Sequence, residues 1–521
     1  MALSAWAAVA YDRLATTKAL SVRLTRLKCM RSPLSSVERE RIMQTMTIDL
    51  RAMGGLYEAT ASVREPASPE ELSALFQDAA ARRQRLTLIG ARRSFGEHFL
   101  PPEGAEGVST ARLSGATRLL STEADGSIWV RAPGSLTFEA LHREYPHHLP
   151  YHPPTGDRIS LAGALVACAH NAVGFFAEEV RAFRMMTPDG AVHECHAAAP
   201  GIAGELFRQV PGSFGALGVI LELELRLFRV RERQRAEITV LEHCPTRGFT
   251  ALERLEAVYR AGEYPLGRGL FFLGRRGMSV LLGDRIVMPE PHDKAAPLPL
   301  TDDSTRRNIV AQGIANRMPG LVRPFQGLVL KRGRRFHAGL YGFTFFQRSY
   351  DRAYDYLASP AVLPRMLRAL GVDPRLTVCH QTFAVPVERR RAFLDMYFDV
   401  FDAYPELEAR LEQQDLIRLP ECAWPLHAAH GMPGGAYLLT VSMSVRRGQP
   451  HEARVRAFLG EVSRRAFEAH GVKVLLLKQA HCEPALLRRM HAPFIEALGA
   501  LKQRVDPHRV LTSRMLDALG L

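Results

Sequence analysis

The sequence predicts an α+β fold, and three features of the 521-residue chain carry that prediction. Short strand-like and helix-like patterns alternate in the first half without the long strand–helix–strand repeat of a parallel doubly wound sheet. Turn sequences such as Asp125-Gly126 and Pro188-Asp189-Gly190 separate neighbouring strand-like runs, which is typical of hairpins. A second region, from about Arg231 to His470, again mixes helices with strands. We therefore expect more than one domain.

The first region opens with a helix signal. Ser68-Pro69-Glu70-Glu71 is a capping box with proline at the first helical position, and it predicts a helix that ends near Arg83. The elements expected after it are strands over 86–89 and 128–132, a helix that carries Phe138, Leu141 and His142, a hairpin of 183–186 with 192–195, and a period-two strand over 221–227.

The second region predicts helices over 251–259, 386–401 and 451–469, and strands over 270–273, 279–282, 377–385 and 436–443. The run 472–479 follows and predicts a strand that is apolar on both faces, with a helix over 484–498 behind it. Lys478 lies at the end of that run, in phase with Val474 and Leu476. We therefore expect this lysine to be half-buried, which lowers the pKa of an amine.

Composition limits the classes of protein that the chain can represent. Apolar residues make up 47% of it and charged residues 23%, as in soluble globular proteins, and no run approaches the length of a membrane-spanning helix. The net charge of +14 favours anionic partners, but no nucleic-acid-binding motif accompanies it, so we expect no specific nucleic acid. The seven cysteines are scattered and never form a CxxC motif, which predicts free thiols and a reducing, cytoplasmic location.

Two basic segments leave alternatives open. Residues 1–45 are rich in lysine and arginine, and they are either a membrane-surface helix, a leader, or an overlong N-terminus upstream of a start at Met46. Between Asp303 and Asp351 there is no acidic residue, and the basic residues of 306–348 alternate with apolar ones. That segment is either a solvated lid or a surface that meets a phosphorylated lipid or an acidic membrane.

The loop from Gly90 to Gly96 is a candidate anion site. It follows the strand at 86–89 and reads Gly90-Ala91-Arg92-Arg93-Ser94-Phe95-Gly96. Glycine permits positive φ angles and a close approach to a ligand, and backbone N–H groups that converge after a strand bind phosphate oxygens. The loop is neither a Rossmann nor a Walker loop, so by itself it also fits an ordinary surface turn.

Two further segments of small residues favour the anion site over the ordinary surface turn. The first runs over 154–171 and includes a stretch, 162–169, that is too small to fill a core by bulk but lets a flat ring lie against the backbone. A tightly packed alanine-rich helix is the alternative. The second reads Pro211-Gly212-Ser213-Phe214-Gly215-Ala216-Leu217-Gly218-Val219-Ile220. Together with the first loop, they predict a site for a large anionic cofactor.

The order and spacing of the three segments resemble the FAD-binding domain of the vanillyl-alcohol-oxidase (PCMH-type) superfamily, over roughly residues 54–230 and again at the C-terminus. The resemblance implies a two-subdomain FAD-binding domain over 46–230, a cap or substrate domain on an antiparallel sheet over 231–470, and a return to the FAD domain over 471–521, after the basic extension 1–45. The residues that it implies at the FAD are Gly90, Ala91, Arg92, Arg93, Ser94, Phe95, Gly96, Thr155, Gly156, Ser160, Gly163, Ala167, Ala169, His170, Gly215, Gly218 and Ile220.

The C-terminal part is similar to decaprenylphosphoryl-ribose 2'-oxidases and to aldonolactone oxidoreductases. The second group includes enzymes of the D-arabinono-1,4-lactone oxidase type. In those proteins a lysine in a Leu-Ala-Lys-Asp-like strand lies near the flavin, and Lys478 of Leu476-Leu477-Lys478-Gln479 takes that place, with Gln479 as a departure. A second matching strand puts His380 and Thr382 on one face, where the family carries two other polar residues. We expect Lys478, His380 and Thr382 to be the catalytic residues, although a core packing role is open for His380.

At two positions, the residue type bears on the flavin chemistry that the resemblance implies. Arg93 occupies the position at which flavin-linked members carry a histidine bound covalently to the ring, so the resemblance implies noncovalent FAD. Ala169 occupies a position at which oxidases of the resembled family carry glycine and dehydrogenases carry alanine. The resemblance therefore implies a dehydrogenase that reacts poorly with oxygen and uses a quinone or another carrier as electron acceptor. The run His193-Glu194-Cys195-His196 alternates between strand faces, so we expect no metal site.

The resemblance therefore implies an FAD-dependent dehydrogenase that oxidises a hydroxyl of a sugar, polyol, lactone or sugar-lipid. One alternative is a reductase of a carbon–carbon double bond, as in the sterol-reductase branch, which the segment Val210-Pro211-Gly212-Ser213-Phe214-Gly215 also resembles. Another is a peripheral membrane-binding protein whose flavin site has decayed. The two basic segments motivate that alternative.

Overall fold

The computed structural model describes residues 45–521 apart from 151–155, 172–173, 230–234, 245–248, 265–266, 273–278, 288–334, 339–365 and 367–376. The basic extension predicted over 1–45 therefore lies outside the described residues except for its last position. The basic segment 306–348 does too, apart from the short strand β14. Thr155 also falls outside. Within the described part, no helix is both long and apolar enough to cross a membrane.

The N-terminal sheet carries the first cofactor loop at the end of one strand. Its described strands are β1 (Met46–Arg51), β2 (Glu58–Arg64), β3 (Leu86–Ile89) and β4 (Glu106–Ser109), in the order β1-β2-β4-β3. Helix α3 (Pro69–Arg82) begins at Ser68, whose hydroxyl accepts a hydrogen bond from the Glu71 N–H, and ends at Arg83 with a φ of 55°. This confirms the predicted helix. Its buried face, led by Leu72 and Phe76, packs with Leu86 and Val108 of the sheet.

A second sheet holds the other two cofactor segments. Its described strands are β5 (Arg118–Thr122), β6 (Ile128–Pro133), β7 (His148–Leu149), β8 (Val180–Met186), β9 (Val192–His196) and β10 (Val219–Arg229), and both predicted hairpins are present as antiparallel pairs. Strand β10 is central, between β6 and β8, and its burial alternates along the strand as the period-two pattern predicts. Helices α4 (Phe138–Glu144), α5 (Leu161–Val166) and α6 (Gly201–Gln209) and the 3₁₀ turn η1 (Phe176–Glu179) belong to this region.

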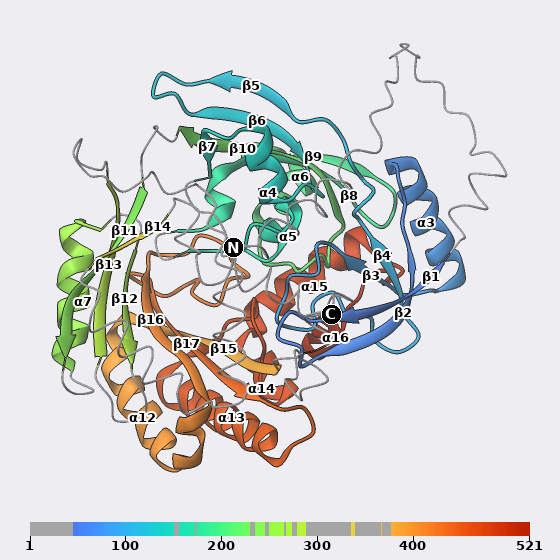
Figure 1. Ribbon diagram of the computed structural model, residues 1–521. Coiled ribbons are helices and arrows are strands. Elements are labelled where there is room, and N and C mark those ends of the chain that lie inside the picture. Colours follow the sequence, from blue (N-terminus) through green and yellow to red (C-terminus); the bar gives the residue numbers. More distant parts are fainter. Residues whose placement is uncertain are drawn as a thin grey trace. The chain divides into compact units, whose positions relative to one another are not determined.

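The second half of the chain forms one large sheet in the order β14-β11-β13-β12-β16-β17-β15-β18, with antiparallel pairing throughout its described ladders. The strands are β11 (Arg235–Cys244), β12 (Gly267–Phe272), β13 (Ser279–Val287), β14 (Arg335–Ala338), β15 (Thr377–Pro386), β16 (Leu411–Leu419), β17 (Ala436–Val445) and β18 (Lys473–Val474). Figure 1 shows this sheet with α12 (Arg390–Asp402) and α13 (Pro450–His470) against it and α7 (Phe249–Ala261) beside β12. The mixed α+β architecture with an additional antiparallel sheet is thus confirmed.

The alternation along β15 decides which of its residues face the helices. Gln381 donates a hydrogen bond to Ser463 of α13 at 2.9 Å, and Cys379, Phe383 and Val385 belong to the core that α12 and α13 cover. Successive side chains of a strand point to opposite faces, so His380 and Thr382 face away from these helices. The short 3₁₀ turns η3 (Val387–Arg389) and η4 (Pro405–Arg410) flank α12.

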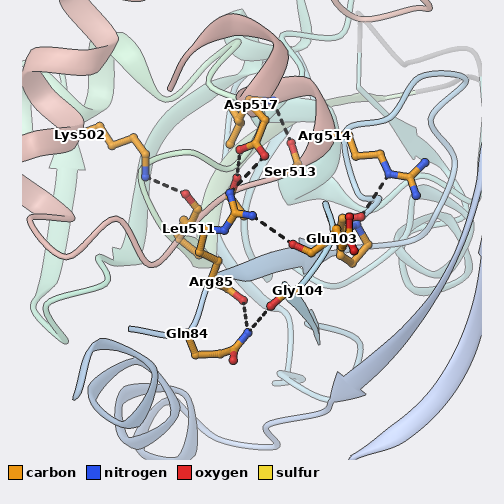
Figure 2. Close-up of polar contacts among 12 residues, drawn as sticks. Gln84, Arg85, Glu103, Gly104, Lys502, Leu511, Ser513, Arg514 and Asp517 are labelled. Carbon is orange, nitrogen blue, oxygen red and sulfur yellow. Dashed lines mark hydrogen bonds and ion pairs between the residues drawn. The ribbon is translucent and has the colours of Figure 1, made fainter. Parts of the chain in front are cut away.

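The C-terminal residues pack on the first sheet. Leu86 and Leu511 form a parallel bridge, with the Leu86 N–H donating to Val510 O at 2.7 Å and the Thr512 N–H donating to Leu86 O at 2.8 Å. Figure 2 shows the side chains around this contact, where Arg85 pairs with Asp517 and Lys502 donates to Leu511 O. The last helices are α14 (Pro484–Met490), α15 (Ala492–Val505) and α16 (Arg514–Leu519).

Two element predictions were wrong. The strand predicted over 472–479 shrinks to Lys473–Val474, and Leu476–Lys478 form a turn. An apolar run buried on both faces does not distinguish a strand from a buried turn. The helix predicted over 484–498 breaks into α14 and α15 at His491. Pro493 explains the break, because proline lacks the N–H that a continuous helix needs and is tolerated in a first turn.

Candidate functional site

The loop from Gly90 to Gly96 offers unpaired backbone donors. Within the described part of the chain, the N–H groups of Ala91, Arg92 and Ser94 donate no hydrogen bond. Arg92 has a φ of 57° and an exposed side chain, and the Ser94 carbonyl is held by the Met53 N–H at 2.8 Å. Free N–H groups beside a left-handed residue are the geometry of an anion-binding nest.

The second cofactor segment meets this loop at Ser160. The Ser160 hydroxyl caps α5 by accepting from the Gly163 N–H at 3.2 Å. A Cβ added to Gly163 would lie 2.8 Å from this hydroxyl, and one added to Gly90 would lie 3.3 Å from it. The absence of side chains at both glycines therefore lets the two segments approach, and the three residues form one cradle.

The third segment reaches the same place through Phe214 and Gly215. The Phe214 N–H donates to Val166 O of α5 at 2.8 Å. Gly215, with a φ of 82°, lies against Leu88 of β3. Phe214 has a φ of 51°, a strained value for a residue with a side chain. The three segments that the sequence singled out are thus brought together around the end of β3.

Two predicted cofactor residues of the third segment, Gly218 and Ile220, have packing contacts within the second sheet. A Cβ on Gly218 would lie 2.3 Å from Met186 O of the neighbouring strand, and the Ile220 carbonyl lies against Gly134. Both residues lie where β10 begins, at contacts within the second sheet. Of the other predicted residues, Gly156 is buried next to the cap of α5, and Ala167 ends that helix.

His98 ties the first loop to the chain around Lys478, and the sequence reading missed it. Its Nδ1 is 2.6 Å from the Ser94 hydroxyl, and its Nε2 is 2.6 Å from the Leu476 carbonyl. Burial lowers the pKa of His98 to about 4, although the Leu476 contact opposes this, so the ring is neutral at neutral pH. Its ring also packs on Phe214, with centroids 4.6 Å apart.

A polar row crosses the large sheet on the face opposite α12 and α13. His380 pairs with Ser442 and Thr382 with Thr440 in the β15–β17 ladder, and Thr440 pairs in turn with Asp415 of β16. The His380 Nδ1 lies 2.5 Å from the Ser442 hydroxyl, and the Thr382 and Thr440 hydroxyls are 3.2 Å apart. Asp415 is buried in this register. The sequence analysis did not predict the part of this row on β17. The alternation of polar residues at Thr440, Ser442 and Ser444 is the sequence pattern that could have indicated it.

The turn at Leu476–Lys478 runs along this row. The Leu475 N–H donates to Thr382 O at 2.8 Å, and the Gln479 N–H donates to His380 O at 3.2 Å. Lys478 is half-buried, as predicted, and its Nζ lies 5.2 Å from the Phe95 ring centroid. The three predicted catalytic residues are therefore brought together, although Lys478 comes from a turn and not from a strand.

Gln479, the departure from the resembled pattern, joins the first loop to β15. Its amide nitrogen donates to Phe95 O at 3.2 Å and to Val378 O at 3.0 Å, and its amide oxygen accepts from the His380 N–H at 2.7 Å. The side chain is fully buried. A carboxylate has no protons for these two carbonyl oxygens, so glutamine at this position has a structural reason.

His380 carries an unused nitrogen at the centre of the site. Its side chain is buried, and within the described residues its Nε2 has no hydrogen-bond partner. Burial, with the positive charge of Lys478 and the nearby His481, holds the pKa of His380 well below its usual range. The imidazole is therefore neutral at neutral pH. A buried polar atom without a partner is costly, which indicates that a ligand atom belongs there.

His170 is a second histidine whose pKa is affected by the charge of Lys478. Burial, His427 and Lys478 together hold the pKa of His170 well below its usual range. Its Nδ1 lies 3.4 Å from the Nε2 of His427, and the two rings meet edge to face. Lys478 therefore acts electrostatically on both His170, in the FAD segment, and His380, in the polar row.

The residues fit a dinucleotide cofactor with a flat ring system. The free N–H groups and arginines of the first loop suit a pyrophosphate, and the glycine cradle at Ser160 removes bulk where such a cofactor meets the backbone. His380 of the polar row and Lys478 both lie against Phe95 of this loop, so the arrangement would place hydroxyl-binding groups near a bound redox cofactor. Such a site defines the class of cofactor-dependent oxidoreductases.

Sequence comparison agrees with that class. The profile of the FAD binding domain family matches residues 60–196, which span the first loop, the Ser160 cradle and strand β9. The chain therefore contains an FAD-binding domain of the PCMH type, and flavin-dependent oxidoreduction is the activity that it supports. No curated protein matches the chain. Among the described residues, no group of three or more histidine, cysteine, aspartate or glutamate side chains could hold a metal ion.

Proposed function

We propose that the protein is an FAD-dependent dehydrogenase that oxidises a hydroxyl group of a sugar, polyol, lactone or sugar-lipid. The observation that carries this proposal is the buried, unpartnered Nε2 of His380, whose ring stacks on Phe95, the same ring over which the Lys478 Nζ lies. FAD, when bound, supplies the two-electron acceptor for the hydride of the carbinol carbon.

The first loop and the Ser160 cradle hold the cofactor. The N–H groups of Ala91, Arg92 and Ser94 would bind its phosphate oxygens, and Arg92 and Arg93 would balance their charge. Arg93 stands where a histidine would form a covalent link, and both ring nitrogens of His98 already have partners. Noncovalent binding follows, because the loop offers no free nucleophile to the flavin.

His380 receives the hydroxyl proton of the substrate. With its Nδ1 donating to Ser442, the neutral ring presents a lone pair at Nε2. The low pKa of His380 keeps that lone pair available over the neutral range. Lys478 orients the substrate oxygen and stabilises the negative charge that develops on it. Thr382, Thr440 and Asp415 bind further hydroxyls along the row, which suits a polyhydroxylated substrate.

The electron acceptor in this proposal is a quinone or another carrier. Ala169 directly precedes His170 and is buried, and its methyl group would restrict the approach of oxygen to a bound flavin.

Anaerobic bleaching of the flavin absorbance tests the function. The FAD-loaded protein is mixed with a panel of sugars, polyols, aldonolactones and sugar phosphates, and one class is expected to bleach it. Lys478→Ala and His380→Ala are expected to lower the bleaching rate by on the order of 100-fold while retaining flavin. Lys473→Ala is the matched control, because the Lys473 ammonium lies over the Phe494 ring whereas that of Lys478 lies over Phe95.

Three outcomes would overturn the proposal. A near-normal bleaching rate in Lys478→Ala would show that the lysine does not orient the substrate oxygen or stabilise its charge. Bleaching by NADPH or NADH, with reoxidation by an unsaturated lipid, shows a reductase of a carbon–carbon double bond. Absence of flavin after addition of FAD, together with sedimentation on acidic liposomes, shows a binding protein.

A further inference from the structure

Two histidines far apart in the sequence meet at the end of the second cofactor segment. His170 follows helix α5 and belongs to the residues that match the FAD-binding domain, and His427 lies in the loop between β16 and β17 of the large sheet. The Nε2 of His427 lies 3.4 Å from the Nδ1 of His170, and the ring centroids are 5.3 Å apart with planes at 86°. The contact therefore joins the FAD-binding region to the large sheet.

The ring of His427 is held in one position by its surroundings. The residue is 2% exposed, and the Phe175 ring packs against it edge to face with centroids 5.0 Å apart. Phe175 also forms an antiparallel bridge with His170, so one buried aromatic residue contacts both histidines. The backbone of His427 is fixed as well, because its N–H donates to Trp424 O at 3.1 Å and its carbonyl accepts from the His430 N–H at 2.9 Å.

A backbone donor decides which nitrogen of His427 carries the proton. The Ala429 N–H donates to the Nδ1 of His427 at 3.1 Å. A backbone N–H only donates, so this Nδ1 presents its lone pair. A neutral imidazole carries its proton on the other nitrogen, and a cationic ring would turn a second N–H toward that of Ala429. The contact therefore puts the proton of His427 on Nε2.

The proton on His427 in turn decides the tautomer of His170. Because the Nε2 of His427 donates, the Nδ1 of His170 accepts. Burial is the largest cause that holds the pKa of His170 well below its usual range, so its ring is neutral and carries one proton. That proton therefore lies on Nε2. Within the described residues this Nε2–H has no hydrogen-bond partner, and His170 is only partly buried.

The unused N–H of His170 suits a flavin ring. His170 is separated from the cradle at Ser160 by the short helix α5. The pyrimidine side of a flavin presents carbonyl oxygens and ring nitrogens with lone pairs, and hydrogen bonds to such atoms tune the electronics of the cofactor. The other tautomer of His170 would turn a lone pair toward these acceptors and repel them.

We propose that His427 is a positioning residue that holds His170 as its Nε2–H tautomer, so that His170 donates a hydrogen bond to the ring of bound FAD. This inference rests on the proposed function for the identity of the acceptor. The tautomer of His170 depends only on the contacts among Ala429, His427 and His170.

Nitrogen NMR on the full-length protein, labelled with ¹⁵N at histidine and supplied with FAD, tests the tautomer. Long-range correlations between the ring carbon protons and the two ring nitrogens distinguish the Nε2–H form from the Nδ1–H form. The signals of His170 are identified by their loss in His170→Gln. The Nε2–H form is expected, and the Nδ1–H form or an equal mixture overturns the proposal. This measurement on the wild-type protein holds even where a variant at residue 427 fails to fold.

Two variants at residue 427 separate positioning from packing. His427→Phe keeps a flat ring but has no donor, so His170 is expected to become a mixture of tautomers. The dissociation constant of FAD, measured by flavin fluorescence, is then expected to rise roughly 3- to 10-fold. The reduction potential of the flavin is expected to fall, because the lost donor no longer stabilises the negative charge that the ring gains on reduction. His427→Gln, whose carboxamide supplies an N–H donor, is expected to restore all three properties.

His430→Phe is the matched control in the same loop. The Nδ1 of His430 contacts the Cys422 carbonyl at 2.8 Å, and its ring packs on Phe494, so this variant removes a histidine without removing the donor to His170. It is expected to leave the tautomer and the flavin potential as in the wild-type protein. An unchanged potential and FAD affinity in His427→Phe overturn the proposal. Absence of bound flavin in the wild-type protein contradicts the proposed function, whereas the wrong tautomer with flavin bound contradicts this proposal alone.

Discussion

The His380 ring stacks on the Phe95 ring, with centroids 4.5 Å apart and planes 21° from parallel. Phe95 belongs to the first cofactor loop and His380 to the large sheet, so this contact joins the two halves of the site. Gln479 bonds the backbones of the same two residues. The position of the histidine relative to the FAD loop therefore depends in part on this packed junction.

Acid precipitation of the FAD-loaded protein is expected to release all flavin into the supernatant. The reason is that Arg93 cannot form a covalent link and His98 has both ring nitrogens occupied. Visible absorbance of the two fractions is the measurement. Yellow colour that stays in the pellet would show a covalent link and contradict this interpretation.

Gly96→Ala is expected to displace Lys478 without loss of flavin. An added Cβ would lie 2.7 Å from the Lys478 carbonyl oxygen, and a backbone atom has to move to relieve that contact. A shift of about 1 Å in a positioning group costs roughly 100-fold in kcat/KM. Gly115→Ala is the control, because its Cβ would make an ordinary contact of 3.5 Å with Pro133. Equal activity of the two variants would show that the position of Lys478 does not matter.

Gln479→Leu is expected to destabilise the fold by on the order of 3 kcal/mol, because it leaves two carbonyls and one N–H buried without partners. The free energy of unfolding in urea, measured with FAD bound, reports this loss. Gln77→Leu provides a comparison, since Gln77 is exposed and forms a hydrogen bond at 3.5 Å. A loss no larger than that of the control would refute the joining role of Gln479.

His491 is expected to make stability fall with acidity. Burial lowers its pKa to about 4, with help from Lys473 and His427 and against the contact with the Val474 carbonyl. The unfolded state, with a pKa near 6.5, binds the proton first, so stability is full above about pH 6.5 and falls as the pH drops toward 4. Between pH 7.5 and 4.5 this histidine costs about 2 kcal/mol or more, a loss that His491→Leu lacks.

Urea unfolding at several pH values checks that prediction. The stability difference between the wild-type protein and His491→Leu is expected to move in favour of the variant as the pH falls. A constant difference across the range would mean that His491 does not titrate between its folded and unfolded pKa values.

Ala169→Gly is expected to raise the rate at which oxygen reoxidises the reduced flavin. Removal of the methyl group opens the backbone next to His170, and Ala169 is 6% exposed in the wild-type protein. Stopped-flow absorbance after mixing with oxygenated buffer gives the rate. Fast reoxidation already in the wild-type protein would show an oxidase and exclude the proposed choice of acceptor.

Local sequence patterns were sufficient to predict most of the helices and strands. The capping box at Ser68, the hairpin turns and the period-two strand over 221–227 each depend on neighbouring residues, and all three are present. The turn at Leu476–Lys478 could not be predicted from the sequence. An apolar run indicates that a segment is buried, but it does not indicate whether that segment pairs with a strand. The roles of His98 and Gln479 also escaped, since each contacts residues hundreds of positions away.

The sequence by itself indicated an FAD-binding domain and a mixed α+β architecture, because these follow from residue type and short-range spacing. The catalytic candidates came from the resemblance to a known family, and they stay predictions. Only the tertiary structure decided which groups meet. It placed Lys478 on a turn against the Phe95 ring, stacked His380 on the same ring, and left the His380 Nε2 without a partner among the described residues. These relationships depend on long-range packing, in which the burial of apolar surface brings distant side chains together and sets their pKa values.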